Sequence, residues 1–300
     1  MKNWANKILC LDNIKAMSKI PDNSVNLTIT SPHYRNAIDY DMHAKHGNNP
    51  KKNYRGKLDL GTDTYMKDMK KTFDEVYRIT VEGGFCCVVI ANEINHGTLI
   101  PLPSLLTREL VDSGWNLHEE IVWHKVTGGA NRAGSFVQHP YPSYFRANIM
   151  HEKILVFRKG ANKLRRDMGY AFKNLSVKLY HEIANSVWHI APVPPGYLDH
   201  PCPYPEEIPY RLINLYSYPG DIVFDPFNGS GQTTKLAKQL GRKYLGIDIQ
   251  KKYVELAKKR LKEPLNIRHE SLILDFDEEL EIPRWKKVST WTDKKIQDYK

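Results

Sequence analysis

The chain has 300 residues and a formal net charge of +10, enough length for one large domain or two small ones. Its 41% hydrophobic and 26% charged residues are typical of globular proteins and exclude collagen-like, coiled-coil and disordered classes. No apolar run approaches the roughly 20 residues that cross a bilayer, and the first residues lack the apolar segment of a secretory signal. We therefore expect a cytoplasmic protein without a membrane partner. The four cysteines form no C-x-x-C pair and no zinc-ligand cluster, which predicts neither a disulfide framework nor a metal.

In the first half of the chain, two strands with a helix between them are predicted. Residues 27–30 are a β-branched run ended by Ser31-Pro32, which indicates a strand that leads into a turn. Apolar residues recur at helical spacing over residues 65–80, and Gly83-Gly84 are expected to end that helix. Residues 85–90 are apolar without alternation, as in a strand covered on both faces.

The alternation of helix and strand continues toward the C-terminus. Helices are predicted at residues 102–113, 205–217, 232–240 and 250–261. Strands are predicted at residues 121–123, 154–157, 221–225 and 243–248. This rhythm predicts an α/β domain built on a parallel sheet.

A glycine turn between a strand and a helix is the strongest functional signal. The turn reads Asp225-Pro226-Phe227-Asn228-Gly229-Ser230-Gly231, and a second strand ends at Asp248. Glycines allow a close approach to a ligand, and the helix N-terminus offers free N–H groups. A P-loop is excluded because no Gly-Lys-Ser/Thr follows, and the dinucleotide fingerprint lacks its third glycine. Asp225 disfavours a pyrophosphate and suits cationic groups, while Asp248 can accept ribose hydroxyls, a combination that fits S-adenosylmethionine.

Taken together, Thr30-Ser31-Pro32-His33-Tyr34 and residues 225–234 resemble the catalytic and cofactor motifs of the DNA amino-methyltransferases. The catalytic tetrapeptide of that family is (Asp/Asn/Ser)-Pro-Pro-(Tyr/Phe). Because the catalytic motif comes first, the chain is similar to the permuted beta group, over roughly residues 8–262. Three residues depart from the family pattern, namely His33 for the second proline, Gln232 for a threonine, and Cys202 within a proline-rich block.

The resemblance implies a Rossmann-like, class I methyltransferase fold with a mostly parallel sheet and helices on both faces. It implies a catalytic half at residues 1–125, an inserted basic target-recognition region at 126–190, a cofactor half at 191–262, and an extension of unknown role at 263–300. The expected cofactor is S-adenosyl-L-methionine, with Asp12 at its adenine. The expected partners are double-stranded DNA and a cognate restriction endonuclease, in a prokaryotic or viral host.

The resemblance also assigns roles to residues. Ser31 Oγ and the Pro32 carbonyl would accept the two hydrogens of a base amine, and Tyr34 would stack on the extruded base. His33 is either a filler of the turn or a direct contact to the base. Residues 123–178 carry +9 of the net charge of +10, which favours phosphate contacts. The DNA-binding candidates are His33, Lys125, Arg132, Arg146, Arg165 and Arg166.

Several alternatives remain. Serine in the first motif position favours cytosine N4 as the target, and adenine N6 is the runner-up. A carbon-5 cytosine methyltransferase would use a Pro-Cys nucleophile, but Cys202 precedes the cofactor glycines, whereas in that family the cysteine follows them. A catalytically silent DNA- or RNA-binding protein of the same fold, or an enzyme with an RNA substrate, would share the basic segment.

Overall fold

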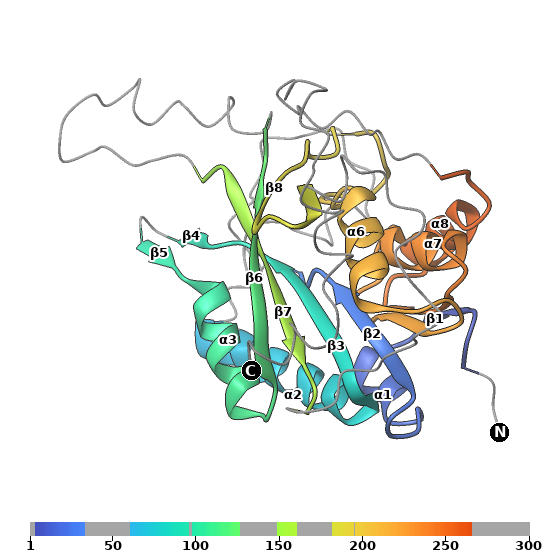
Figure 1. Cartoon of the computed structure of the whole chain (residues 1–300), viewed down its shortest axis with the longest axis horizontal. Coiled ribbons are helices and arrows are strands. Elements are labelled where there is room, and N and C mark those ends of the chain that lie inside the picture. Colours follow the sequence, from blue (N-terminus) through green and yellow to red (C-terminus); the bar gives the residue numbers. More distant parts are fainter. Residues whose placement is uncertain are drawn as a thin grey trace, which may run out of the picture. The chain divides into compact units, whose positions relative to one another are not determined.

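An eight-stranded mixed sheet organises the part of the chain that the structure describes (Figure 1). This computed structural model describes residues 4–33, 61–95, 98–126, 149–160, 182–194 and 196–265. The strands of the sheet are β1 (Lys7–Cys10), β2 (Val25–Thr30), β3 (Thr80–Ile90), β6 (Asn116–His124), β7 (His151–Arg158), β8 (Val187–His189), β9 (Ile222–Asp225) and β10 (Lys243–Asp248). Strands β4 (Glu93–Asn95) and β5 (Thr98–Ile100) form a separate antiparallel pair. The helices are α1 (Asn13–Met17), α2 (Thr62–Ile79), α3 (Leu102–Asp112), α6 (Glu207–Tyr216), α7 (Gln232–Gln239) and α8 (Lys251–Arg260).

The strand order is β1-β10-β9-β2-β3-β7-β6-β8, and every strand except β7 runs in the same direction. The expectation of a mostly parallel sheet is therefore confirmed. Strand β7 is antiparallel to both of its neighbours, β3 and β6. Antiparallel strands can be joined without a helical crossover. This suits β6 and β7, which are consecutive strands in the chain. The carboxyl ends of the parallel strands meet at one edge of the sheet.

Both faces of the sheet are covered by helices, as the absence of alternation in residues 85–90 predicts. In β3, Cys86 and Val88 pack in one apolar cluster, whereas Cys87 and Val89 pack in another on the opposite face. Helices α1, α2 and α3 contribute to the first cluster, and α6 and α7 to the second. Helix α8 packs on β1 through Val254.

The expected end of the helix at Gly83-Gly84 is wrong. Helix α2 ends at Ile79, and Thr80 already has the extended backbone that begins β3. Both glycines lie inside this strand. A Cβ on Gly84 would lie 2.9 Å from the Asn26 carbonyl oxygen, so this glycine permits the close approach of β2 rather than ending a helix.

The two halves and the insertion that the sequence predicts all contribute strands to the same sheet. Strand β2 of the catalytic half pairs with β9 of the cofactor half. Strands β7 and β8 of the expected insertion are also members of this sheet. The described residues belong to one compact unit, 1–267, and the extension from residue 268 lies outside them. Within the described ranges, no helix combines the length and apolar character needed to cross a membrane.

Candidate active site

The two motifs meet at the carboxyl edge of the sheet, although about 190 residues of chain separate them. Strands β2 and β9 pair directly, with Leu27 opposite Val223 and Thr28 opposite Phe224. Where both strands end, the Thr30 hydroxyl donates a hydrogen bond of 2.6 Å to Asp225 Oδ1. The turn that begins at Ser31 therefore lies beside the glycine turn that begins at Asp225.

The catalytic candidates directly follow β2. Ser31 is half-buried and Pro32 is buried, while the predicted stacking residue Tyr34 lies outside the described residues. The His33 ring packs edge-on against Phe227 of the glycine turn, with ring centres 5.8 Å apart. Burial lowers the pKa of His33, and the nearby Asp68 partly opposes this shift. A neutral imidazole thus connects the catalytic turn to the cofactor turn.

The glycine turn has the backbone conformation that its sequence predicts. Gly229 and Gly231 have φ values of 45° and 81°, in the left-handed region that favours glycine. A Cβ on Gly231 would lie 2.7 Å from the Cβ of Ala257, so the turn packs directly against α8. Gly231 is also the N-cap residue of α7. Because glycine has no side chain, no N-cap side chain accepts a hydrogen bond from the first N–H groups of this helix.

Two of the predicted cofactor residues lie at the ends of neighbouring strands. Asp248 ends β10, and its carboxylate accepts the N–H groups of Gly229 and Gln250, both at 2.8 Å. Burial raises the pKa of Asp248, and these two hydrogen bonds oppose the shift. Asp12 follows β1, which pairs with β10, and its Oδ1 accepts the Lys15 N–H at 2.9 Å. Each carboxylate keeps lone pairs for a ligand.

The carboxylate of Asp225 is turned away from the surface. The side chain is 1% exposed. Oδ1 accepts hydrogen bonds from Thr30 and the Phe227 N–H, and Oδ2 accepts one from Tyr204 at 3.3 Å. Burial raises its pKa to about 6, although the donors around it, Thr233 included, favour the charged form. These hydrogen bonds show that Asp225 shapes the turn from inside, and its direct contact with cationic groups of a ligand stays a prediction.

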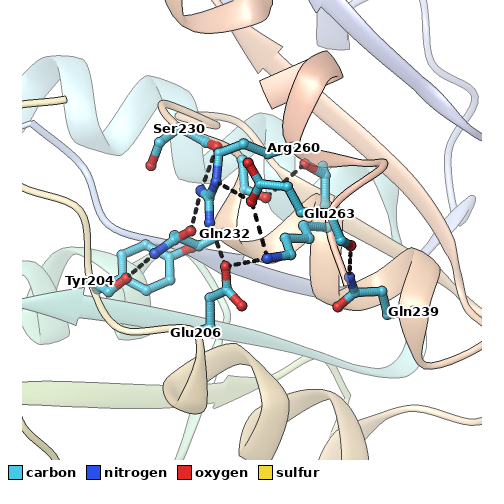
Figure 2. Close-up of polar contacts among 10 residues, drawn as sticks. Tyr204, Glu206, Ser230, Gln232, Gln239, Arg260 and Glu263 are labelled. Carbon is cyan, nitrogen blue, oxygen red and sulfur yellow. Dashed lines mark hydrogen bonds and ion pairs between the residues drawn. The ribbon is translucent and has the colours of Figure 1, made fainter. Parts of the chain in front are cut away.

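A buried cluster of charges supports the turn from the other side (Figure 2). Arg260 of α8 donates to the Ser230 carbonyl at 2.8 Å and also contacts Gln232, Glu206 and Glu263. The Gln232 amide in turn donates to the Tyr204 carbonyl at 2.6 Å. Gln232, which departs from the family pattern, thus makes two contacts that the shorter side chain of threonine would not reach.

Three cations of the basic segment have partners inside the protein. Lys125 pairs with the buried Glu152, and Lys153 pairs with Glu120 at 2.8 Å. Lys159 is buried and donates to two backbone carbonyls. These contacts give the three cations structural partners, and DNA binding by Lys125 stays a prediction. The other predicted arginines, Arg132, Arg146, Arg165 and Arg166, lie outside the described residues.

Sequence reasoning missed three residues around the turn. Tyr204 and Thr233 contact Asp225 from the segment before α6 and from α7. Arg260 belongs to a basic helix end, yet its spacing of three from Ala257 places it on the buried face of α8. That spacing could have identified Arg260, whereas nothing local in the sequence identifies Tyr204 or Thr233 as partners of Asp225.

The arrangement suits a ligand that combines a ribose with an anionic group. The N-terminus of α7, which has no side-chain cap, can bind an anion, and Asp248 can accept hydroxyl groups. Beside Asp248, Ile249 is 68% exposed and offers an apolar surface. The buried Asn228 side chain has an Nδ2 without a hydrogen-bond partner, so a donor remains available in the turn. These features fit S-adenosylmethionine. Among the described residues, no three histidine, cysteine, aspartate or glutamate side chains lie together in a group that could hold a metal ion.

Known proteins resemble the chain over most of its length. The family model N6_N4_Mtase, described as DNA methylase, matches residues 25–259. The chain is similar to the orphan methyltransferase M.BamHII of Bacillus amyloliquefaciens, at 27% identity over 81% of this chain and 91% of that protein. It is also similar to a solved structure of TTHA0409 from Thermus thermophilus complexed with S-adenosyl-L-methionine, with 24% identity, a TM-score of 0.66, and coverage of 85% of this chain and 93% of that one. A second similar structure is the PvuII DNA methyltransferase, described as cytosine-N4-specific, with 18% identity, a TM-score of 0.65, and coverage of 87% and 88%. These likenesses confirm the expected class I methyltransferase fold.

Proposed function

The chain belongs to the DNA methylase family whose model matches residues 25–259, and on that premise we propose that it transfers a methyl group from S-adenosyl-L-methionine to cytosine N4 in DNA. The observation that carries the proposal is the hydrogen bond between Thr30 and Asp225. It joins the strand end that bears Ser31 to the strand end that bears the glycine turn. A methyl donor in the turn and an amine beside Ser31 would therefore be neighbours.

The cofactor would bind along the carboxyl ends of β1, β9 and β10. The N–H groups at the start of α7 would hold its carboxylate, together with the backbone of residues 226–231. Asp248 would accept the ribose hydroxyls. Asp12 would accept the amine of the adenine, and the exposed side chain of Ile249 would contact the ring. Asp225 acts on the cofactor indirectly, because it holds the Phe227 N–H and the start of the turn. When bound, the cofactor supplies an electrophilic methyl group on a positively charged sulfur.

The catalytic residues orient the target amine rather than activate it by proton removal. Serine is a weak base at neutral pH, so Ser31 Oγ and the Pro32 carbonyl accept the two hydrogens of the amine. This aims the nitrogen lone pair at the methyl group. Orientation of this kind can lower a barrier by about 7–11 kcal/mol in favourable cases. The proton leaves after the methyl group has arrived, when the nitrogen has become acidic.

The target base has to leave the duplex to reach this edge of the sheet. Flipping costs a few kcal/mol, and stacking of the base on Tyr34 would return about 1–3 kcal/mol. His33, packed between the catalytic turn and Phe227, lines the same space. We assign the remaining DNA affinity to phosphate contacts from Arg132, Arg146, Arg165 and Arg166, with Lys125 restrained by its ion pair with Glu152.

The choice of base rests on Ser31. Serine in the first position of the tetrapeptide accompanies cytosine more often than adenine in this family, whereas aspartate more often accompanies adenine. The PvuII enzyme, described as cytosine-N4-specific, shares the fold and supports the same choice. Adenine N6 remains the alternative, because it is also an exocyclic amine that Ser31 and Pro32 could orient. A silent nucleic-acid-binding protein would bind DNA without methyl transfer.

The experiment is to incubate DNA with the protein and S-adenosylmethionine, digest it, and identify the methylated nucleoside by mass spectrometry. We expect N4-methylcytosine. N6-methyladenine would overturn the choice of base alone, whereas DNA binding without any methylated nucleoside would overturn the proposed activity. Ser31→Ala should lower the yield by orders of magnitude. The matched control is Ser24→Ala, at the other end of β2, where the hydroxyl donates only to nearby backbone carbonyls.

The companion restriction endonuclease stays a prediction. The name of the M.BamHII relative describes an orphan methyltransferase, whereas M.HpaI of Haemophilus parainfluenzae, 26% identical to this chain, is named a type II methyltransferase. A companion nuclease would cleave unmodified DNA at the site that this protein methylates. Cleavage of unmethylated but not methylated DNA by extracts of the source cells tests this.

A further inference from the structure

A proline-rich segment, residues 200–205, contacts the glycine turn at two points. A Cβ on Gly229 would lie 2.7 Å from His200 Nε2, so the imidazole packs against the turn where a side chain would otherwise be. Further along the segment, the Tyr204 hydroxyl donates to Asp225 Oδ2 at 3.3 Å and accepts a hydrogen bond from the Thr233 hydroxyl. The segment therefore contacts the turn both in its middle and at its first residue.

Tyr204 connects three elements of the proposed site, namely β2, the glycine turn and the start of α7. Through Asp225 it reaches Thr30, which directly precedes Ser31. Thr233, which contacts Tyr204, also lies beside β2, with its hydroxyl oxygen 3.1 Å from the Ile29 carbonyl oxygen. Its own carbonyl accepts the Gln232 amide at the start of α7 (Figure 2). A shift of Tyr204 would thus change the catalytic strand and the cofactor turn together.

The position of Tyr204 is restricted by its neighbours. Pro203 and Pro205 flank it, and a residue before proline is confined to extended backbone conformations. A restricted backbone loses less entropy when the contact forms. Burial and the nearby Asp225 carboxylate raise the pKa of Tyr204 well above its ordinary value, so its hydroxyl keeps the proton and acts as a donor.

We propose that Tyr204 is a positioning residue that holds the Ser31 turn and the glycine turn in register through Asp225. This inference rests on the proposed function, because it assumes that S-adenosylmethionine binds at the glycine turn. Tyr204 does not touch the reacting atoms. It acts by stabilising the Asp225 carboxylate, which in turn holds Thr30 and the Phe227 N–H.

The groups around Asp225 define the pH dependence that follows. Thr30 contacts it from β2, the Phe227 N–H from the turn, Tyr204 from the proline-rich segment and Thr233 from α7. Tyr204 is the titratable group among these contacts. Loss of its hydroxyl removes a donor that favours the carboxylate, so the pKa of Asp225 should rise above its value of about 6.

The test compares Tyr204→Phe with Tyr216→Phe in the full chain. The Tyr216 hydroxyl also donates to a carboxylate, Glu119 Oε2, at 2.8 Å, but this bond lies outside the proposed site. The dissociation constant of S-adenosylmethionine is measured by calorimetry from about pH 5 to pH 8. Wild-type binding should weaken as the pH falls through about 6. In Tyr204→Phe the pH at which cofactor binding is half lost should be higher than in the wild type. Its affinity for S-adenosylmethionine at pH 7 should be about tenfold weaker, as expected for the loss of one hydrogen bond to a charged group.

Each outcome is decisive. Tyr216→Phe should match the wild type, and a Tyr204→Phe curve that also matches it would overturn the positioning role alone. No binding by the wild type would overturn the proposed function and this inference with it. Weaker binding with an unchanged midpoint would indicate lost packing and also overturn the inference. If Tyr204→Phe does not fold, Thr30→Val removes another hydroxyl that donates to Asp225, and the pH midpoint of its cofactor binding should move in the same direction.

Discussion

Replacement of Arg260 by methionine tests the buried charge cluster beside the glycine turn. Methionine keeps the unbranched shape of the side chain and fills much of its volume, but it lacks the charge and all the donors. Arg260 is 2% exposed and donates to the Ser230 carbonyl, Gln232, Glu206 and Glu263. Lys235 remains beside Glu206 at 2.7 Å, so the cluster would keep two carboxylates with one cation.

The expected loss follows from burial. Removing one partner of a buried ion pair costs about 3–5 kcal/mol of unfolding free energy, because the remaining charge stays desolvated. For a domain of this size the loss corresponds to a fall in melting temperature of about 6–20 °C. The matched control is Lys258→Met on the same helix. Lys258 pairs with Glu255 at 3.3 Å with side chains 50% and 61% exposed, so we expect a loss of about 0–1 kcal/mol.

The assay is thermal and urea unfolding of the wild type, Arg260→Met and Lys258→Met, with circular dichroism as the signal. We expect Arg260→Met to be destabilised by at least about 2 kcal/mol more than Lys258→Met. Equal stability of the two variants would refute the reasoning, because the carboxylates around Arg260 would then not depend on its charge.

Two further predictions concern the turn itself. Gly231→Ala should lower the free energy of unfolding by about 2–5 kcal/mol, because a clash with Ala257 of about 1–3 kcal/mol adds to about 1–2 kcal/mol of strain from the positive φ. The control Gly241→Ala has a similar φ of 73° with open space around it, so it should cost only the strain, and equal losses in urea unfolding would contradict the close packing on α8. Asp225→Asn should change the pH dependence of stability, since the folded pKa of Asp225 is about 6 against an ordinary 3.8. The folded state binds this proton more tightly than the unfolded state does. The free energy of unfolding of the wild type should therefore fall by about 3 kcal/mol as the pH rises from about 4 to 7, and the variant should lack that fall. Parallel stability curves would show that the carboxylate is not desolvated.

The sequence predicts the carboxyl ends of the strands well because they depend on local pattern. Residues 243–248 match β10, and the helix expected at 232–240 matches α7 to within one residue. The meeting of Ser31 and Asp225 also follows from pattern, since both residues lie at the ends of strands in a mostly parallel sheet. Strand β8, with three residues, is too short for a periodic signal, and the sequence does not predict it.

The contacts around Asp225 could not be predicted in the same way. Its partners Thr30 and Tyr204 lie 195 and 21 residues away in the chain, and no spacing links a threonine before Ser31 to a tyrosine between two prolines. The acid resembles a ligand group because it adjoins glycines. Its burial by α7 and the proline-rich segment is a tertiary effect, and through it Asp225 also supports both motifs.

The most direct test of the central claim separates cofactor binding from methyl transfer. Calorimetry with S-adenosylmethionine and single-turnover transfer of a labelled methyl group to DNA are measured for Ser31→Ala and Asp248→Asn. We expect Ser31→Ala to bind the cofactor like the wild type but to transfer methyl groups slower by orders of magnitude, whereas Asp248→Asn should weaken cofactor binding by about tenfold or more. Wild-type transfer by Ser31→Ala, or unaltered cofactor affinity in Asp248→Asn, would contradict the claim that an amine at the end of β2 faces a methyl donor held by the glycine turn.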